Sequence, residues 1–304
     1  MQQQLLFYDV LIRRAVCPPQ QLASLQSKYH TTLAGFSGEK RVLFELNEIQ
    51  IPHSVIHDFI SFNNSKQKIQ IDIIFICKHF VLVLEVKNIT GRIDFDDRRR
   101  QFIRTRLDGQ QESFMNPVDQ VKRHQQYLES IFLAESEFIP IESAIVIANP
   151  NTLIGQVPSE VLVFNVSGLR TIIDGFYKKY AHVTLNMRRV HVKLKSHCVE
   201  QSLKLSAKDY EIRRGVFCLD CGELMIVESR GFKCLKCCHW DVNDRALKST
   251  LKDYKILYGN EITNARFRDF CGIGSPSTAN NFLTRLQLPF KGKNKGRVYL
   301  LDEF

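Results

Sequence analysis

The chain has 304 residues, of which 44% are hydrophobic and 24% are charged, a composition that is typical of a folded globular protein and excludes a disordered chain. Its 42 Lys and Arg exceed its 32 Asp and Glu, and the resulting net charge of +10 favours phosphate-rich or anionic-membrane partners. Because no apolar run approaches the roughly 20 residues that span a bilayer and the first residues lack the order of a signal peptide, we expect a cytoplasmic protein.

The first amphipathic stretch ends in the sequence AGFSGEKRVLFEL, which predicts a helix that begins near residue 37. Ser37 or Gly38 can cap this helix, and Glu39 then lies in its first turn. Further along, apolar spacing predicts alternating strands and helices up to about residue 182, as in an α/β domain. The expected elements are a hairpin over 69–88, strands over 91–97 and 98–107, a helix from Pro117, buried strands over 142–149 and 160–166, and a helix over 167–180.

The hairpin of residues 69–88 carries three charges within its apolar pattern. A two-residue turn at Lys78 and His79 places Asp72 opposite Glu85 and Gln70 opposite Lys87, so that four polar side chains share one end of one face. The other face is then apolar and packs against the core. It carries Ile69, Ile71, Ile73 and Phe75 on the first strand, and Phe80, Leu82, Leu84 and Val86 on the second.

Opposed carboxylates at this spacing, with Cβ atoms about 4.5–5.5 Å apart, repel each other unless a proton or a cation lies between them. A divalent ion is the natural cation, and oxygen ligands with a third carboxylate from a helix suit Mg²⁺ or Mn²⁺. Lys87 could then hold an attacking water or offset charge on a phosphorane. The alternative is a salt-bridged hairpin edge in which Lys87 pairs with Glu85 or Asp72 in solvent.

Five motifs occur in an order that resembles the nuclease-related domain (NERD), a branch of the PD-(D/E)XK nuclease superfamily. They are SGEKRV, QIDIIFI, EVKNITGRIDFD, NPVDQVKRHQQYL and PIESAIVIANPNT, and the resemblance covers roughly residues 30–165. It implies a restriction-endonuclease-like α/β core, a mixed sheet flanked by helices. It also implies that Glu39 is the helix carboxylate, that Asp72 and Glu85 are metal ligands, and that Lys87 is the catalytic lysine. Gln70 and Gln120 are the implied supporting polar residues.

Two C-x-x-C pairs, separated by twelve residues, predict a zinc ribbon over residues 216–241. The ligands are Cys218, Cys221, Cys234 and Cys237. Four thiolates leave no open coordination position, so we expect a structural Zn²⁺ that stabilises a segment too small for its own core. Cys238 and His239 could exchange with a ligand, although we treat them as bystanders, and two disulfides would require an oxidising compartment.

Residues 242–304 predict a helix-turn-helix followed by a wing. An amphipathic helix, a turn at 272–274, a second helix capped by Ser275 with Pro276 at its first position, and a Lys-rich hairpin follow one another. The expected phosphate contacts are Arg285, Lys291, Lys293, Lys295 and Arg297, and Ser277, Thr278, Asn280 and Asn281 could reach base edges. The alternative is a basic solvated face without a ligand.

These predictions divide the chain into a nuclease-like domain (1–182), a basic helical connector (183–215), the zinc ribbon and the winged-helix-like domain. They favour a metal-dependent endonuclease that hydrolyses phosphodiester bonds of nucleic acid, with DNA as the expected substrate, and that does not bind membranes. A helicase or another DNA-processing protein is a candidate partner. The alternatives are a non-catalytic DNA-binding or regulatory protein that retains the nuclease fold, and a protein that associates with anionic membrane surfaces.

Overall fold

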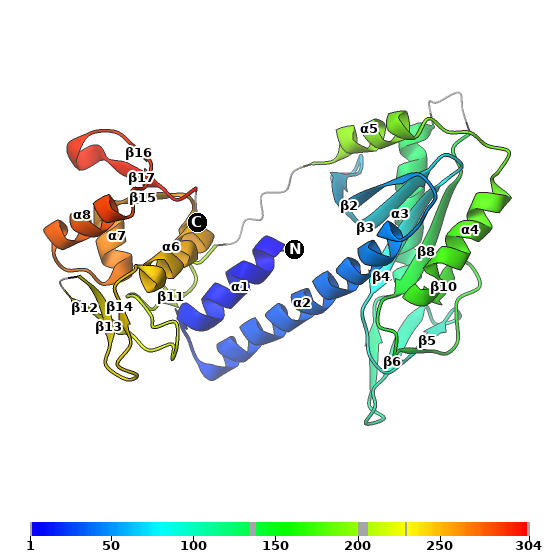
Figure 1. Cartoon of the computed structure of the whole chain (residues 1–304). Coiled ribbons are helices and arrows are strands. Elements are labelled where there is room, and N and C mark those ends of the chain that lie inside the picture. Colours follow the sequence, from blue (N-terminus) through cyan, green and yellow to red (C-terminus); the bar gives the residue numbers. More distant parts are fainter. Residues whose placement is uncertain (1, 134–137, 200–205, 229, 303–304) are drawn as a thin grey trace. The chain divides into compact units, whose positions relative to one another are not determined.

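The computed structural model describes residues 2–133, 138–199, 206–228 and 230–302, and it divides into two compact units (Figure 1). Unit 1 comprises Met1–Thr32 and Leu203–Phe304, whereas unit 2 comprises Leu33–Ser202. The boundary between residues 32 and 33 falls inside one helix, α2 (Pro19–Asn47). Among the described residues, none of the helices has the length and apolar character that crossing a membrane requires.

Unit 2 is built on a mixed five-stranded sheet in the order β10-β8-β4-β3-β2. The strands are β2 (His53–Phe62), β3 (Lys68–Cys77), β4 (Val81–Lys87), β8 (Ile141–Ile147) and β10 (Leu162–Asn165). The first three pair antiparallel, whereas β4, β8 and β10 pair parallel. The predicted α/β class, with strands buried in a mixed sheet, is therefore confirmed.

Helices cover both faces of this sheet (Figure 1). The second half of α2 and α4 (Leu169–Lys179) bury one face through residues such as Val42, Leu46 and Ile173. On the other face, α3 (Pro117–Phe132) and α5 (Met187–His197) contribute Val121 and Leu194 to a second apolar cluster. Because both faces are covered, the central strands read as nearly continuous apolar runs rather than alternating ones.

A smaller sheet in unit 2 has the order β7-β6-β5-β9. Its strands are β5 (Arg92–Asp96), β6 (Gln101–Thr105), β7 (Gln111–Phe114) and β9 (Leu153–Ile154). Phe95 and Phe102 are buried with their ring centroids 4.8 Å apart, whereas the arginines of β5 and β6 lie at the surface and pair with acids. The strands predicted over 91–97 and 98–107 are thus present.

The hairpin of β3 and β4 has the predicted register. The backbone N–H of Cys77 donates to the carbonyl of Phe80 across the turn, and Ile73 pairs with Leu84. The prediction of a single apolar face was wrong, because Ile71 packs with the α3 side of the sheet and Ile73 with the α2 side. The strand therefore twists at Asp72, next to which Asp58 of β2 has a φ of +53°.

The predicted helix start at Ser37 or Gly38 was also wrong, because α2 begins at Pro19 and both residues lie in its interior. Gly38 instead permits a close approach to the end of β4. A Cβ atom at Gly38 would lie 2.7 Å from the Cβ of Asn88, a separation that side chains essentially never show. The Asn88 side chain also donates to the carbonyl of Ala34 at 2.8 Å. These contacts hold the helix turn that carries Glu39 against the strand that carries Glu85.

Unit 1 combines the two ends of the chain. Its helices are α1 (Gln2–Arg14), the first half of α2, α6 (Arg245–Tyr258), α7 (Asn264–Cys271) and α8 (Pro276–Arg285). Its strands are β1 (Ala15–Val16), β11 (Glu211–Ile212), β12 (Met225–Glu228), β13 (Gly231–Cys234), β14 (Trp240–Asp241), β15 (Glu261–Thr263), β16 (Phe290–Lys291) and β17 (Val298–Leu300). Strands β12 to β14 form one sheet, β15, β17 and β16 another, and β1 pairs with β11.

One core joins these elements. Leu11 of α1, Phe232 of β13 and Phe282 of α8 belong to the same apolar cluster, and the last two rings stack with centroids 5.0 Å apart. The residues 216–241 therefore do not stand apart from 242–304 as a separate domain. Residues 1–32, which we expected in the nuclease-like domain, pack with the C-terminal segments, and α5 of the expected connector packs on β2 and β3.

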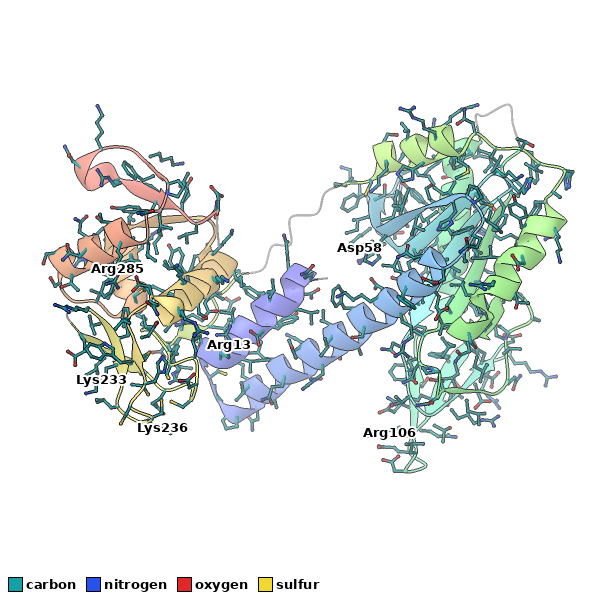
Figure 2. All side chains as sticks on the ribbon, in the orientation of Figure 1. Arg13, Asp58, Arg106, Lys233, Lys236 and Arg285 are labelled. Carbon is teal, nitrogen blue, oxygen red and sulfur yellow. The ribbon has the colours of Figure 1, made fainter. Side chains whose placement is uncertain are left out.

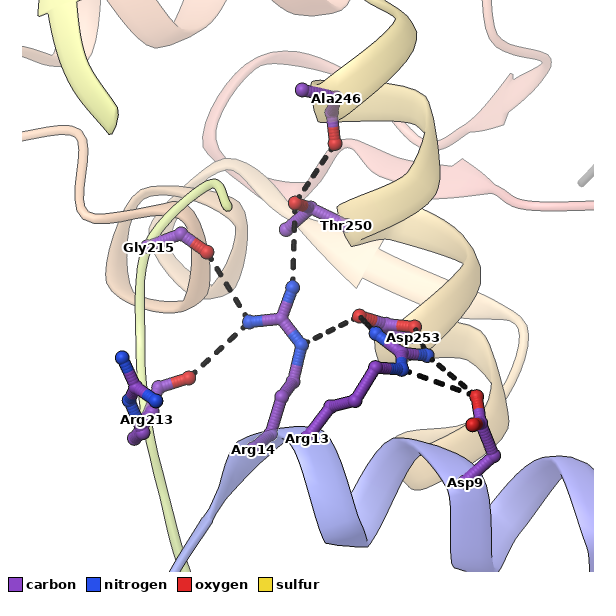
Figure 3. A network of polar contacts seen from close by, with 8 residues as sticks. All are labelled: Asp9, Arg13, Arg14, Arg213, Gly215, Ala246, Thr250 and Asp253. Atoms are coloured by element: carbon purple, nitrogen blue, oxygen red, sulfur yellow. Dashed lines mark hydrogen bonds and ion pairs between the residues drawn. The ribbon is translucent and has the colours of Figure 1, made fainter. Parts of the chain in front are cut away.

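Arg14 anchors α1 within unit 1 (Figure 3). Its guanidinium, on a side chain that is only 1% exposed, donates to Asp253 at 2.6 Å and to the carbonyls of Arg213 and Gly215 at 3.2 Å. It also lies 4.7 Å from the ring centroid of Phe217. Burial lowers the pKa of Arg14 from its ordinary value, although the charge of Asp253 opposes the shift.

Candidate functional site

Asp72 and Glu85 lie where β3 and β4 separate. The backbone pairing of the two strands ends at Ile73 and Leu84, and Asp72 and Glu85 are the next residues in that register. The backbone N–H of Val86 then donates to the Asp72 carboxylate at 2.8 Å. The Asp72 carboxylate thus accepts a backbone hydrogen bond from β4 just beyond the segment where the two strands pair. This bond fixes the carboxylate beside β4.

Glu85 is 2% exposed and has unequal carboxylate oxygens. Its Oε1 accepts from the Lys87 ammonium at 2.7 Å, whereas its Oε2 is buried and has no hydrogen-bond partner among the described residues. The nearest ring nitrogen, Nδ1 of His124 on α3, lies 3.7 Å from Oε2 and is likewise without a partner there. A buried, unpartnered carboxylate oxygen is costly and indicates a missing cation or donor.

Gln120 lies on α3, one turn before His124, and it favours the charged form of Glu85 through a side-chain hydrogen bond. The helix begins as predicted, with Pro117 at its first turn and Asn116 as N-cap accepting from the N–H of Val118 at 3.0 Å. The structure therefore brings Gln120 to the carboxylates. Gln70 differs, because its amide donates to Asp58 at 2.9 Å and accepts from Lys68 at 2.8 Å.

Glu39 is 4% exposed and hydrogen-bonds with His57 of β2, with Oε2 and Nε2 2.6 Å apart. Neither His57 nor His124 was among the site residues predicted from the sequence. Strand alternation offered the only signal for His57, which lies opposite Ile73 in the sheet. His124 follows Gln120 by four residues, the spacing that places two side chains on one helix face, and this spacing could have revealed it.

Burial and mutual repulsion govern the protonation of these groups. Burial, followed by the charge of Glu85, raises the pKa of Asp72 well above its usual value. Burial also raises the pKa of Glu85, although Lys87 opposes this shift. The pKa of His124 falls to about 4 because burial and the charges of Arg123 and Lys87 disfavour its protonated form. His124 is therefore neutral at pH 7.

The donors at this site fit a hard divalent cation. Glu39, Asp72 and Glu85 supply carboxylate oxygens, the ligands that Mg²⁺ and Mn²⁺ prefer, and a cation would relieve both the repulsion and the unpartnered Oε2. Among the described residues, however, the carboxylates do not form a set of three ligand atoms within 4.8 Å of one another. A cation must therefore compete with His57 for Glu39 and with Lys87 for Glu85.

The four predicted cysteine ligands meet at one point in unit 1. All four Sγ atoms lie within 4.8 Å of one another, with Cys218 and Cys237 3.6 Å apart and Cys221 and Cys234 3.5 Å apart. A tetrahedral ion with Zn–S bonds of about 2.3 Å requires sulfur separations of about 3.8 Å. The thiols are free rather than disulfide-bonded. His239 instead pairs with Asp220 at 2.8 Å, and Cys238 is exposed.

The basic residues of the C-terminal segment differ in their availability. Arg285, labelled in Figure 2, donates through two nitrogens to the buried carboxylate of Asp244 and to the carbonyl of Arg230 at 3.1 Å. Arg297 lies over the ring of Phe290 at 4.1 Å. Lys293 is exposed, Lys291 pairs with Glu261 at 2.5 Å, and the Lys295 side chain lies outside the described residues. Arg285 is thus held by unit 1 itself.

The four helix residues expected at base edges are accessible. Ser277, Asn280 and Asn281 are exposed on α8, and Thr278 is half-buried. The helix is capped as predicted, because Ser275 accepts from the N–H of Thr278 at 3.3 Å and Pro276 occupies its first turn. The turn before it contains Gly272 with a φ of +69°, a backbone conformation that glycine adopts without steric cost.

Comparisons with known proteins identify one region of the chain. Searches of the curated proteins and of the solved structures gave no significant match. A family model described as the nuclease-related domain matches residues 34–148, a segment that contains the site residues Glu39, Asp72, Glu85 and Lys87 as well as Gln120. Over residues 34–148, therefore, the chain is similar to the nuclease-related domain.

Proposed function

We propose that unit 2 is a metal-dependent endonuclease that hydrolyses phosphodiester bonds of nucleic acid, with DNA as the expected substrate. In this proposal Glu39, Asp72 and Glu85 hold Mg²⁺ or Mn²⁺. The ion would supply charge stabilisation and a water of lowered pKa. The observation that carries the proposal is the buried Oε2 of Glu85, which has no partner among the described residues and lies beside a second carboxylate of raised pKa.

The protein groups contribute in different ways. The Lys87 side chain is 26% exposed, so its ammonium can reach a phosphate while it remains hydrogen-bonded to Glu85. A cationic donor at this position offsets charge that develops on the phosphoryl oxygens. Gln120 orients the Glu85 carboxylate, and neutral His124 adds no competing positive charge beside it. The proposal gives Gln70 no role in the site.

The proposal is tested by measuring cleavage and metal binding with the same protein. Wild-type protein should nick plasmid DNA in Mg²⁺ or Mn²⁺, and EDTA should stop the reaction. Ca²⁺ or Mn²⁺ should raise the thermal midpoint of unit 2 in the wild type but not in Asp72→Asn. Absence of cleavage on plasmid, linear and single-stranded substrates, together with no metal-dependent stabilisation, would contradict the proposal.

Asp72→Asn should also stabilise the metal-free protein. The substitution removes a buried charge that Glu85 repels, while its amide oxygen can still accept from the N–H of Val86. We expect an increase of about 1 kcal/mol, or about 2–4 °C in the thermal midpoint for a unit of this size. Asp94→Asn, in the same unit, is a control, because the Arg92 guanidinium holds the pKa of Asp94 below its usual value. It should not stabilise the protein.

We also propose that Cys218, Cys221, Cys234 and Cys237 bind a structural Zn²⁺. Cys218 and Cys234 are buried in the same apolar cluster as α6 and α8, so zinc loss should destabilise all of unit 1. The purified protein should contain one zinc per chain, and Cys234→Ser should lose the zinc and expose unit 1 to proteolysis. Cys238→Ser is the matched control. It should keep the zinc and the resistance of unit 1 to proteolysis, because Cys238 is exposed.

A second proposed function is nucleic-acid binding by the segment from α6 to β17. The order α6, β15, α7, α8, β16, β17, with β17 between β15 and β16, is the one expected for a winged helix and supports this proposal. The rival function, binding without cleavage, rests on the same observation. Protein that binds DNA in EDTA but cuts nothing in any metal would favour the rival.

The wing lysines provide the test of this binding. Replacing Lys291 and Lys293 by alanine should weaken DNA binding and lower the slope of log K against log salt by about 1 to 2. The apparent KM of cleavage should rise more than kcat falls, because the tail raises the local substrate concentration. Lys248→Ala removes an exposed lysine of α6 and serves as control. Removing all of residues 249–304 is unsuitable, because it cuts through α6 and its buried face.

A further inference from the structure

Unit 1 contains a cavity of about 750 Å³ whose lining includes neither the cysteine cluster nor the exposed face of α8. The end of β1, the strand β11 with the two arginines after it, and one side each of α6 and α7 form its wall. Its volume is within the range of about 300–1,000 Å³ that is typical of small-ligand sites. Neither the proposed nuclease site nor the proposed zinc site uses these residues.

One wall of the cavity is aromatic. Tyr254 and Tyr258 follow one another by one turn of α6, with ring centroids 5.2 Å apart, and Phe270 of α7 meets both rings edge-on. Tyr254 and Phe270 are buried, which fixes the wall, whereas Tyr258 is 47% exposed. A half-exposed ring that is held by two buried ones offers a flat apolar surface for another aromatic ring.

The rim of the cavity is basic. Arg213, Arg214 and Arg266 line it, against the two acids Glu211 and Asp269. Arg214 pairs with Asp269, whereas among the described residues neither Arg213 nor Arg266 forms an ion pair with a carboxylate. The Arg213 guanidinium rests 4.9 Å from the ring centroid of Phe217, which positions it without neutralising it. Two guanidiniums without an acid partner favour a ligand with a phosphate.

We propose that this cavity binds a nucleotide, with the base against Tyr258 and the phosphate between Arg213 and Arg266. Stacking of a base on an exposed aromatic ring and bidentate contact of arginine with phosphate are recurrent modes of nucleotide recognition. The Glu211 carboxylate would repel inorganic phosphate, but it can accept a hydrogen bond from an exocyclic amine or a ribose hydroxyl. The nucleotide is either a free mononucleotide or the 5′-phosphorylated end of a strand.

Binding is measured with the full-length protein in buffer without added divalent ions or chelator, so that no cleavage contributes and the zinc remains. The titrants are a purine 5′-mononucleotide, the corresponding nucleoside, inorganic phosphate, and a short single strand with or without a 5′-phosphate. We expect the mononucleotide or the phosphorylated strand to bind at least about tenfold more tightly than the nucleoside and than phosphate alone. Whichever of the two binds identifies the source of the ligand.

Single substitutions locate the ligand in the cavity. Arg213→Ala and Arg266→Ala should each lower the affinity for the nucleotide by about tenfold or more. Tyr258→Leu should lower the affinity for the nucleotide while leaving phosphate binding unchanged. Glu211→Gln should not lower the affinity for inorganic phosphate. Arg245→Ala, an exposed arginine of the same unit outside the cavity, is the control and should bind as the wild type does.

Several outcomes would overturn the proposal. These are the absence of nucleotide binding, equal binding of nucleotide and inorganic phosphate, and an equal loss in Arg245→Ala. Circular dichroism and the thermal midpoint of each variant identify those that fail to fold, and Arg266→Lys then replaces Arg266→Ala, because it keeps the charge but loses bidentate contact. Retained nucleotide affinity in that variant would also contradict the proposal. Since binding is measured without metal, the result does not depend on whether unit 2 cleaves nucleic acid.

Discussion

Lys87→Ala should lower the rate of metal-dependent phosphodiester cleavage on the order of 10³-fold while unit 2 stays folded. The Lys87 ammonium is the only cation whose hydrogen bond to the Glu85 carboxylate is seen among the described residues, at 2.7 Å. Removing it takes away a donor that would stabilise charge in the transition state, and such a loss costs about 10²- to 10³-fold in related cases. The measurement is single-turnover cleavage of a labelled strand at saturating protein.

Two further variants separate a chemical role of Lys87 from a structural one. Lys87→Arg keeps the charge beside Glu85 but changes the position of the donor, so it should retain the thermal midpoint and still lose most of the rate. Lys78→Ala removes a lysine from the turn at the other end of the same hairpin, where its ammonium lies 5.4 Å from the ring centroid of Tyr177. Cleavage by Lys87→Ala at the rate of Lys78→Ala would remove Lys87 from the mechanism.

Arg14→Ala should destabilise unit 1 by about 3–5 kcal/mol, because it leaves the buried Asp253 carboxylate without its closest partner. The carbonyls of Arg213 and Gly215 lose their donor in the same step, and the ring of Phe217 loses the guanidinium packed on it. Urea unfolding, followed by the single Trp240 of unit 1, measures the change. Unit 2 contains no tryptophan, so the signal is specific.

Arg13→Ala provides the matched control. Arg13 donates to the same Asp253 at 2.8 Å, but its side chain is 46% exposed and it also pairs with the exposed Asp9. An exposed pair contributes about 1 kcal/mol or less, so this variant should unfold at nearly the wild-type urea concentration. Equal losses in the two variants would show that the contact with Asp253, rather than burial of the Arg14 guanidinium, stabilises the unit.

The local elements of this fold could be predicted from the sequence because short-range chemistry determines them. The two-residue turn at Lys78 and His79 fixed the register of the hairpin, and Pro117 and Pro276 marked the first turns of two helices. The spacing of the four cysteines predicted their convergence. In each case the residues that decide the geometry lie within about 25 positions of one another.

The parts that could not be predicted depend on contacts between distant segments. Gly38 and Ser37 resemble a helix cap, but packing against Asn88 lets α2 continue through them. The residues near Arg14 in the sequence do not indicate that it is buried against Asp253, and those near His57 do not indicate its hydrogen bond with Glu39. Arg285 appeared free in a basic run, yet its partner Asp244 lies 41 residues away. Long-range pairing of this kind leaves no periodic pattern in a single sequence.

The division of unit 1 between the two ends of the chain sets an order on its synthesis. During translation, α1 emerges before the residues of unit 1 beyond position 203, which cover Leu11 and neutralise Arg14. Unit 2 is contiguous and can complete its core as soon as residue 202 has left the ribosome. The apolar side of α1 therefore stays uncovered until the second segment of unit 1 is made. A nascent chain that is stalled before α6 therefore carries a complete unit 2 and an exposed first helix.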